Sequence, residues 1–233
     1  MKTVLNILLA LVAMLAAPCA AQEQLGYARV VTETVEDVEV PDADQHEERG
    51  SDRFVASVND DLPKGVARFG PFRVLDSGHA ALVDVTDERS PAAFAKMLAA
   101  YPGIAELVMI ECPGTVDDTA NLRLGRMIHA RGIATMVPDG GSVRSGAVEL
   151  FLAGARHRAS KGAEFAVHAW ADDDGRQPAD FGADAPVNRA YIDYYREMGM
   201  TLSEARAFYD MTNAVPNNDA RWLTAAQMGL WVR

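Results

Sequence analysis

Cysteine and positive charge are both scarce in this chain. Its 233 residues include two cysteines, Cys19 and Cys112, and 22 basic residues against 33 acidic ones, so the formal net charge is −11. So few cysteines argue against a disulfide framework, and we expect Cys112 to be a small buried residue. The acidic balance argues against nucleic-acid binding, which requires a basic face, and against docking on anionic lipid.

Several common catalytic and ligand-binding motifs are also missing. Ser142 stands in Gly-Gly-Ser-Val-Arg, which is not the G-x-S-x-G elbow of many hydrolases, and the chain has no phosphate-binding loop and no H-E-x-x-H motif. The acidic turn at residues 172–175 lacks the spacing of an EF-hand loop, so we interpret it as a solvated turn. The sequence therefore predicts no bound metal and no organic cofactor.

The N-terminus has the layout of a secretory signal peptide. Lys2 precedes an apolar run at residues 4–17, and small residues then lead to Ala21. The run is shorter than the roughly 20 residues of a transmembrane helix, and Pro18 before Cys19 argues against lipidation. We predict cleavage after Ala21, contact with the membrane only during export, and a periplasmic or secreted mature protein. An uncleaved anchor and a lipidated Cys19 are the alternatives.

The remaining chain divides into an acidic leader and one domain. Residues 22–52 are dense in aspartate and glutamate, so we expect them to be poorly ordered, with an edge strand at 35–40 as the alternative. From residue 53 to 233 the pattern is globular, with no internal repeat and no further linker. Apolar runs predict strands at 54–58, 72–75, 80–85, 107–110, 133–137 and 165–168.

Helices are predicted between these strands. Their expected ranges are 90–101, 117–131, 145–153, 187–198 and 203–213, with a last short helix capped by Thr224. Ser90 is expected to cap the first helix, and Thr201 and Glu204 to form a capping box. Residues 171–186 read as a mobile loop. Strands that alternate with helices predict an α/β fold with a mainly parallel sheet.

Three short segments carry candidate chemistry in a fixed order. Cys112-Pro113-Gly114-Thr115 follows a buried strand, Ser145-Gly146 opens a helix, and His168 follows 23 residues after Ser145 at a strand end. With this order and with Leu223-Thr224 and Gly229-Leu230 near the end, residues 72–230 resemble the ClpP and crotonase superfamily, and in particular its exported ClpP-like proteins. The resemblance covers about two thirds of the chain.

The resemblance implies a serine peptidase or related hydrolase. Ser145 would be the nucleophile, His168 the general base, and the N–H groups of Gly114 and Gly146 the oxyanion donors. Asp219 would be the third member of the triad, with Asp210 as the alternative. The resemblance also implies a homo-oligomer that acts on peptides or unfolded proteins. No ATPase partner is expected outside the cytoplasm, where ATP is scarce.

Several residues depart from the family pattern. Thr115 replaces a glycine of the turn, Arg144 places a large cation before Ser145, and Asp219 is one residue away from the family's acid. These departures support an alternative, a catalytically inactive binding or scaffolding protein of the cell envelope. Acyl-CoA chemistry fits poorly with export. Ser145 as a plain helix cap and His168 as a strand-end histidine are the structural alternatives.

Overall fold

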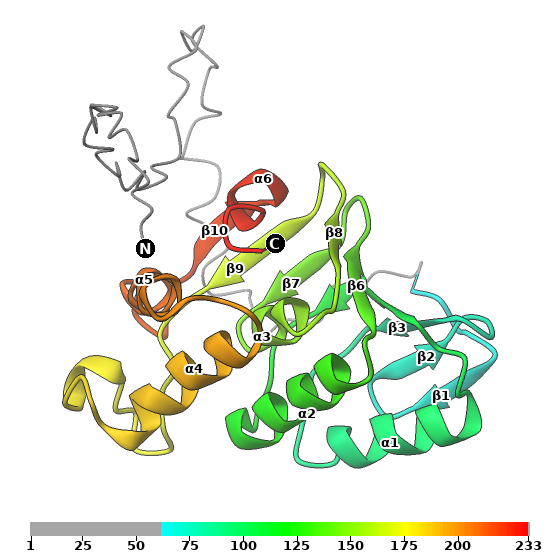
Figure 1. The fold of residues 1–233 in the computed structure, drawn as a ribbon, viewed down its shortest axis with the longest axis horizontal. Helices are drawn as coiled ribbons and strands as arrows, with labels where there is room; N and C mark the ends of the chain where they lie inside the picture. Colours follow the sequence, from blue (N-terminus) through cyan, green and yellow to red (C-terminus); the bar gives the residue numbers. More distant parts are fainter. Residues whose placement is uncertain (1–61, 233) are drawn as a thin grey trace, which may run out of the picture. The chain divides into compact units, whose positions relative to one another are not determined.

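The computed structural model describes residues 62–232 (Figure 1). The predicted signal peptide, the acidic leader and the predicted strand at 54–58 therefore lie outside the described residues. None of the helices within residues 62–232 combines the length and the apolar character that a membrane crossing needs.

A six-stranded sheet forms the first half of the described domain. Its strands, in sheet order, are β1 (Ala67–Phe69), β2 (Phe72–Val74), β3 (His79–Leu82), β4 (Glu106–Met109), β6 (Ala134–Val137) and β8 (His157–Ala159). The first two pairs are antiparallel, and the pairs from β3 to β8 are parallel. The strand predicted at 80–85 is β3, which ends at Leu82, three residues earlier than expected.

A second, four-stranded sheet carries the candidate site. Its strands, in sheet order, are β10 (Arg221–Thr224), β9 (Glu164–Val167), β7 (Ser142–Arg144) and β5 (Glu111–Cys112). The pairs among β5, β7 and β9 are parallel, whereas β10 runs antiparallel along β9. Most strand pairs of the two sheets are parallel, so the predicted α/β class with a mainly parallel sheet is confirmed.

The helices follow the predicted pattern closely. They are α1 (Ser90–Ala100), α2 (Asp118–Ala130), α3 (Ala147–Leu152), α4 (Pro186–Glu197), α5 (Leu202–Asn213) and α6 (Ala225–Met228). In Figure 1, α1 and α2 lie side by side along the six-stranded sheet. The loop at 171–186 holds a single short 3₁₀ turn, η3 (Pro178–Asp180).

Local capping signals explain where several helices begin. Thr201 and Thr224 both accept a hydrogen bond from the third residue of their helices, as expected for caps. The predicted capping box at Thr201 is confirmed, and Thr224 forms one as well. The expected cap at Ser90 was wrong by one residue, because α1 already begins at Ser90 and Arg89 precedes it. The Ser90 hydroxyl instead donates to Asp87 Oδ1 at 2.9 Å, which fixes the turn before the helix.

The core consists of aliphatic side chains with a run of aromatic pairs. Phe72 stacks obliquely on Phe94 at 5.4 Å, which joins β2 to α1. Phe151 meets Phe165 at 4.9 Å, which joins α3 to β9. Each such buried aromatic pair contributes roughly 0.5–1.5 kcal/mol beyond the area that it buries. The second contact matters for the site, because α3 follows Ser145 and β9 precedes His168.

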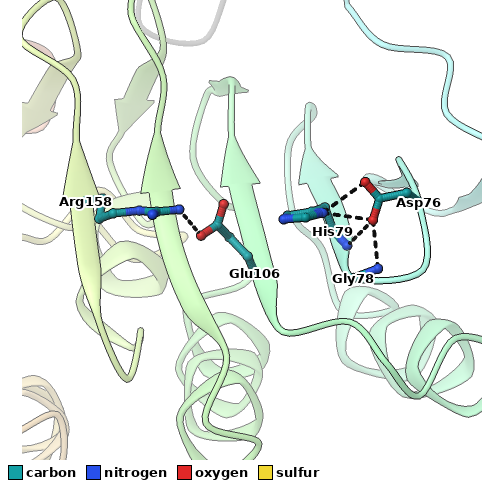
Figure 2. A network of polar contacts seen from close by, with 5 residues as sticks. All are labelled: Asp76, Gly78, His79, Glu106 and Arg158. Atoms are coloured by element: carbon teal, nitrogen blue, oxygen red, sulfur yellow. Dashed lines mark hydrogen bonds and ion pairs between the residues drawn. The ribbon is translucent and has the colours of Figure 1, made fainter.

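Charged side chains mark the beginnings of three parallel strands. Figure 2 shows Arg158 of β8 and Glu106 of β4 pointing toward each other, and they form an ion pair. On the neighbouring strand, His79 Nδ1 lies 2.8 Å from Asp76 Oδ1, which also accepts from the Gly78 N–H. These groups are mostly exposed, so they contribute little stability and mainly keep this edge solvated.

Candidate active site

The turn after β5 is built around a glycine. Gly114 has φ +133°, a conformation that side chains rarely adopt. A Cβ on Gly114 would lie 2.9 Å from Ser145 Cβ and 3.3 Å from Ser145 Oγ. The Gly114 carbonyl accepts from the Thr86 N–H at 3.0 Å and from Thr86 Oγ1 at 3.3 Å. The turn can therefore approach the Ser145 side chain closely only because residue 114 has no side chain.

Ser145 lies at a sharp turn between β7 and α3. Its φ is +51°, the one positive φ of a non-glycine residue among residues 62–232. Such a conformation costs on the order of 1–3 kcal/mol and recurs at active sites. Gly146, not Ser145, is the N-cap of α3, and no side chain caps this helix. The structural alternative in which Ser145 is a plain helix cap was therefore wrong.

The strand–turn–helix arrangement holds Ser145 firmly. Its N–H donates to the Ala166 carbonyl of β9 at 2.8 Å, and its carbonyl accepts from the Val148 N–H at 2.9 Å. The parallel pairing of β7 with β9 therefore extends to Ser145 itself. A serine at the sharp turn between a strand and a helix is the arrangement of a nucleophile elbow, although the G-x-S-x-G motif is absent.

Gly146 makes room for Thr115. A Cβ on Gly146 would lie 2.5 Å from Thr115 Cγ2 and 3.1 Å from Asn121 Nδ2. Thr115 Oγ1 donates to the Thr86 carbonyl at 3.2 Å. Thr115, which replaces a glycine of the family pattern, is therefore accommodated because its methyl group occupies the space that Gly146 leaves.

Two backbone N–H groups at this turn, the oxyanion donors that the sequence predicts, have no acceptor among the described residues. Within residues 62–232, the N–H groups of Gly114 and Gly146 donate no hydrogen bond. Gly114 contacts the Ser145 side chain and Gly146 follows Ser145 directly, so both N–H groups belong to residues at the serine. An oxyanion donor contributes roughly 3–4 kcal/mol to the stability of a transition state.

His168 follows β9 and lines the same cavity as Ser145. Its Nδ1 lies 2.8 Å from the Ala169 carbonyl oxygen. A carbonyl can only accept, so Nδ1 carries a proton, and in the neutral ring Nε2 carries the lone pair that a general base needs. Ser145 and His168 are both described residues, and no hydrogen bond joins them, so Ser145 Oγ does not donate to His168 in this structure.

Asn217 occupies the place expected for an acid. Its Nδ2 lies 3.4 Å from His168 Nδ1 and donates to the Ala169 carbonyl at 2.9 Å. The predicted third member, Asp219, is exposed, and its Oδ1 accepts from the Ala220 N–H. The alternative, Asp210, is an exposed residue of α5. Asn217 lines the cavity with Ser145 and His168, whereas neither aspartate does.

Arg144 points away from Ser145. Successive side chains of a strand alternate between its faces, so Arg144 shares a face with Ser142 and not with Ser145. It forms an ion pair with Glu111 of β5 and donates to Ser142 Oγ at 2.8 Å. Both charged side chains are buried, with 7% and 8% exposure. The large cation expected beside the nucleophile is therefore part of the sheet that supports it.

A cavity of about 380 Å³ opens beside Ser145. It extends from the turn at Ser145 and Gly146 to the tyrosine side chains of α4 and to the start of the 171–186 loop. Its lining includes Thr115, Asp118, Ser145, Gly146, Glu149, His168, Trp170, Asp172, Tyr191, Tyr195, Asn213 and Asn217. The predicted mobile loop therefore contributes to the wall of the cavity through Asp172, which pairs with Arg176 at 2.8 Å.

Two acidic side chains of the cavity have unusual protonation. Burial raises the pKa of Glu149 to about 7, and the nearby charge of Asp118 adds to the rise. The Tyr195 hydroxyl donates to Glu149 Oε1 at 2.7 Å and opposes the rise. Asp118 keeps access to solvent, yet desolvation of its carboxyl also raises its pKa. The sequence analysis missed both residues, although Glu149 is four positions after Ser145, on the helix that the serine precedes.

Cys112 does not belong to the reactive groups of the site. It is fully buried, and burial raises the pKa of its thiol well above its usual range. Its Sγ lies 3.4 Å from the Leu82 carbonyl, so it has the structural role that the sequence suggested. Within residues 62–232, no three histidine, cysteine, aspartate or glutamate side chains form a group that could hold a metal ion.

Comparisons with known proteins give similar structures and no similar sequences. No protein-family model matches the chain, and no curated protein is similar to it in sequence. Among solved structures, a mutant of the 1510-N membrane-bound stomatin-specific protease in complex with a substrate peptide is 14% identical, with a TM-score of 0.41 over 63% of this chain and 70% of that one. A mutant of ClpP1 from Listeria monocytogenes is 12% identical, with a TM-score of 0.43 over 67% of this chain and 88% of that one.

Proposed function

We propose that this protein is a serine hydrolase of the peptidase type, built on a ClpP-like fold. Ser145 attacks a carbonyl carbon, His168 takes the hydroxyl proton, and the N–H groups of Gly114 and Gly146 hold the oxyanion. His168 then donates the proton to the leaving group, and water hydrolyses the acyl-enzyme by the same route in reverse.

The observation that carries this proposal is the conformation of Ser145. A positive φ of +51° places its side chain against Gly114, at a turn whose two glycine N–H groups have no partner within residues 62–232. A serine with a purely structural role would gain nothing from such a strained backbone. His168 lines the cavity on which Ser145 opens, so the proposed base and nucleophile share one space.

Asn217 takes the role of the third member in this proposal. Its amide and the His168 ring share the Ala169 carbonyl as acceptor, and this contact fixes the ring with its Nδ1 proton directed at the backbone. An asparagine amide can orient the imidazole ring. It has no negative charge, so it does not stabilise the imidazolium as a carboxylate does. Nucleophile–histidine–asparagine arrangements are known in other hydrolases, where asparagine fills this place.

Labelling with a fluorophosphonate probe tests the proposal. The parent protein should be labelled at Ser145, and Ser145→Ala and His168→Ala should lose the label. Ser142→Ala is the matched control, because Ser142 lies on the same strand, is buried, and bonds to Arg144 on the opposite face. Labelling that survives in Ser145→Ala, or a folded parent that takes no label, would overturn the proposal.

A non-catalytic binding protein is the second candidate. The absence of a hydrogen bond between Ser145 and His168, together with an amide in place of an acid, favours it. In that case the cavity would bind a peptide without cleaving it. Retention of a peptide by both the unlabelled parent and Ser145→Ala, with no product released, would support this second function.

We also propose that the protein acts outside the cytoplasm as a homo-oligomer. The basis for export is the signal-like sequence of residues 1–21, and the basis for assembly is the resemblance to ClpP-like proteins. Fractionation of cells that express the full chain, followed by mass spectrometry of the mature N-terminus, tests export. Light scattering of the purified protein tests assembly.

A further inference from the structure

Two carboxylates in the cavity have no cationic partner. Asp118 comes from the first turn of α2, and Glu149 comes from α3, one helical turn beyond Ser145. Within residues 62–232, neither forms an ion pair, and their hydrogen-bond partners are the neutral hydroxyls of Tyr191 and Tyr195. The third acid of the cavity, Asp172, differs because Arg176 neutralises it. The cavity lining therefore offers two carboxyl groups that no cation of the described residues neutralises.

The cavity wall offers acceptors and aromatic faces but no lysine or arginine among its described lining residues. Asn213 Nδ2 donates to the Tyr209 carbonyl at 2.7 Å, which directs its Oδ1 the other way. That oxygen is buried and accepts no hydrogen bond within the described part of the chain. Buried polar atoms are rarely left in this state, so a donor from outside the described residues is expected at this oxygen, which belongs to a lining residue of the cavity.

Aromatic rings line the same cavity as the two acids. Trp170 and Tyr191 are parallel, with ring centroids 6.4 Å apart, and Tyr191 and Tyr195 are 6.5 Å apart. Such faces suit an aliphatic chain that ends in a cation. A volume of about 380 Å³ is within the range of roughly 300–1,000 Å³ that is usual for ligand pockets.

We propose that this cavity binds the cationic side chain of a lysine or arginine residue next to the bond that Ser145 cleaves. The side chain would pass the rings of Trp170 and Tyr191 and place its donors between Asp118 and Glu149. The ligand's charge would offset the repulsion between the two carboxylates. This inference rests on the proposed hydrolase function for the cleavage step, but binding of the cation does not depend on catalysis.

Lysine and norleucine derivatives separate the charge of the side chain from its aliphatic part. Norleucine has the same four-carbon chain as lysine and lacks only the terminal ammonium group. The first measurement is binding of Nα-acetyl-lysine methylamide to Ser145→Ala, followed by NMR at the Trp170 indole. The norleucine compound is the control. A charged hydrogen bond predicts a preference for lysine of about tenfold or more.

The second measurement is hydrolysis of the corresponding thioesters by the parent protein. We expect kcat/KM to favour lysine by about tenfold, and the double variant Asp118→Asn, Glu149→Gln to lose this preference. Asp193→Asn is the matched control, because Asp193 is an exposed acid of α4 that pairs with Arg196. The control should keep the preference of the parent.

The outcomes distinguish the two proposals. Binding of the lysine compound without hydrolysis of either thioester would leave the cation site intact and remove the hydrolase function. Hydrolysis with equal rates for lysine and norleucine would keep the hydrolase and overturn the cation site. Equal or absent binding of the two methylamides would also overturn it, whether or not the protein is active.

Discussion

Asn121 Nδ2 donates a 2.5 Å hydrogen bond to the carbonyl oxygen of Gly146, the residue after the proposed nucleophile. Asn121 is buried, and its Oδ1 accepts from Thr86 Oγ1 at 3.0 Å. Thr86 in turn donates to the carbonyl of Gly114. A buried chain of hydrogen bonds therefore connects the two glycines that would form the oxyanion hole.

This connection makes Asn121 a positioning residue in our proposal. In Asn121→Ala, the Gly146 carbonyl and Thr86 Oγ1 lose a partner, so the turn can relax and kcat should fall by about tenfold or more with KM little changed. The measurement is steady-state kinetics, with urea unfolding to show that the variant is folded. Thr119→Ala, an exposed position of the same helix, is the control. A loss of stability with kcat unchanged would contradict the positioning role.

A carboxylate at position 217 should improve the catalytic site. In Asn217→Asp the new carboxylate would lie beside His168 Nδ1 and stabilise the imidazolium that forms during catalysis. We expect a higher kcat/KM, and an acid limb of the pH–rate profile displaced toward higher pH. Asn217→Leu removes the orienting contact and should lower kcat/KM. A profile that is unchanged in Asn217→Asp would show that residue 217 does not act on the histidine.

Glu149 should make stability depend on pH in a defined window. Its pKa is about 7 in the folded protein and near 4.5 when unfolded, so the folded state binds the extra proton between these values. The contribution of Glu149 to the free energy of unfolding is therefore highest below about pH 4.5. It falls as the pH rises toward 7 and is constant above about pH 7. Glu149→Gln should be more stable than the parent at pH 8 by up to about 3 kcal/mol, with little difference at pH 4.5.

Urea unfolding of both proteins at several pH values measures this difference. Comparing the two proteins at each pH removes the contribution of other titrating groups, including Asp118. A gap that stays constant from pH 4.5 to 8 would show that Glu149 does not titrate as proposed.

The buried pair of Arg144 and Glu111 should respond to a double-mutant cycle. Breaking a buried ion pair by removal of one charge typically costs about 3–5 kcal/mol. We expect Arg144→Met and Glu111→Leu each to be strongly destabilised, and the double variant to recover much of the loss. The free energies of unfolding of the four proteins give the coupling. Additive losses would mean that the pair is not coupled.

Local patterns predicted most helices and the α/β class. Pro186 and the Thr201 capping box lie at helix starts because backbone N–H groups need caps whatever the surroundings are. The sequence analysis missed β10 and also β1, β5, β7 and β8, which have two or three residues each. Strands this short carry no detectable alternation, and they exist because a neighbouring strand supplies their hydrogen bonds.

The order of the short motifs along the chain was enough to predict part of the candidate site. Gly114 lies against Ser145, and His168 lines the same cavity as Ser145 and Gly146. Asn217 was missed because the sequence suggested a carboxylate and two aspartates were nearby. Glu149 was missed because a glutamate on a helix normally faces solvent, whereas here it is buried and accepts from the Tyr195 hydroxyl of α4.

The pairing of β10 with β9 has a consequence for how the chain matures. Val167, which precedes His168, is paired with Arg221, and β10 follows every other described strand in the sequence. The edge of β9 therefore stays uncovered until residues 221–224 have been synthesised. A nascent chain that ends before β10 would carry Ser145 without a settled position for His168. Pairing of β10 with β9 would then be the step that completes the proposed site.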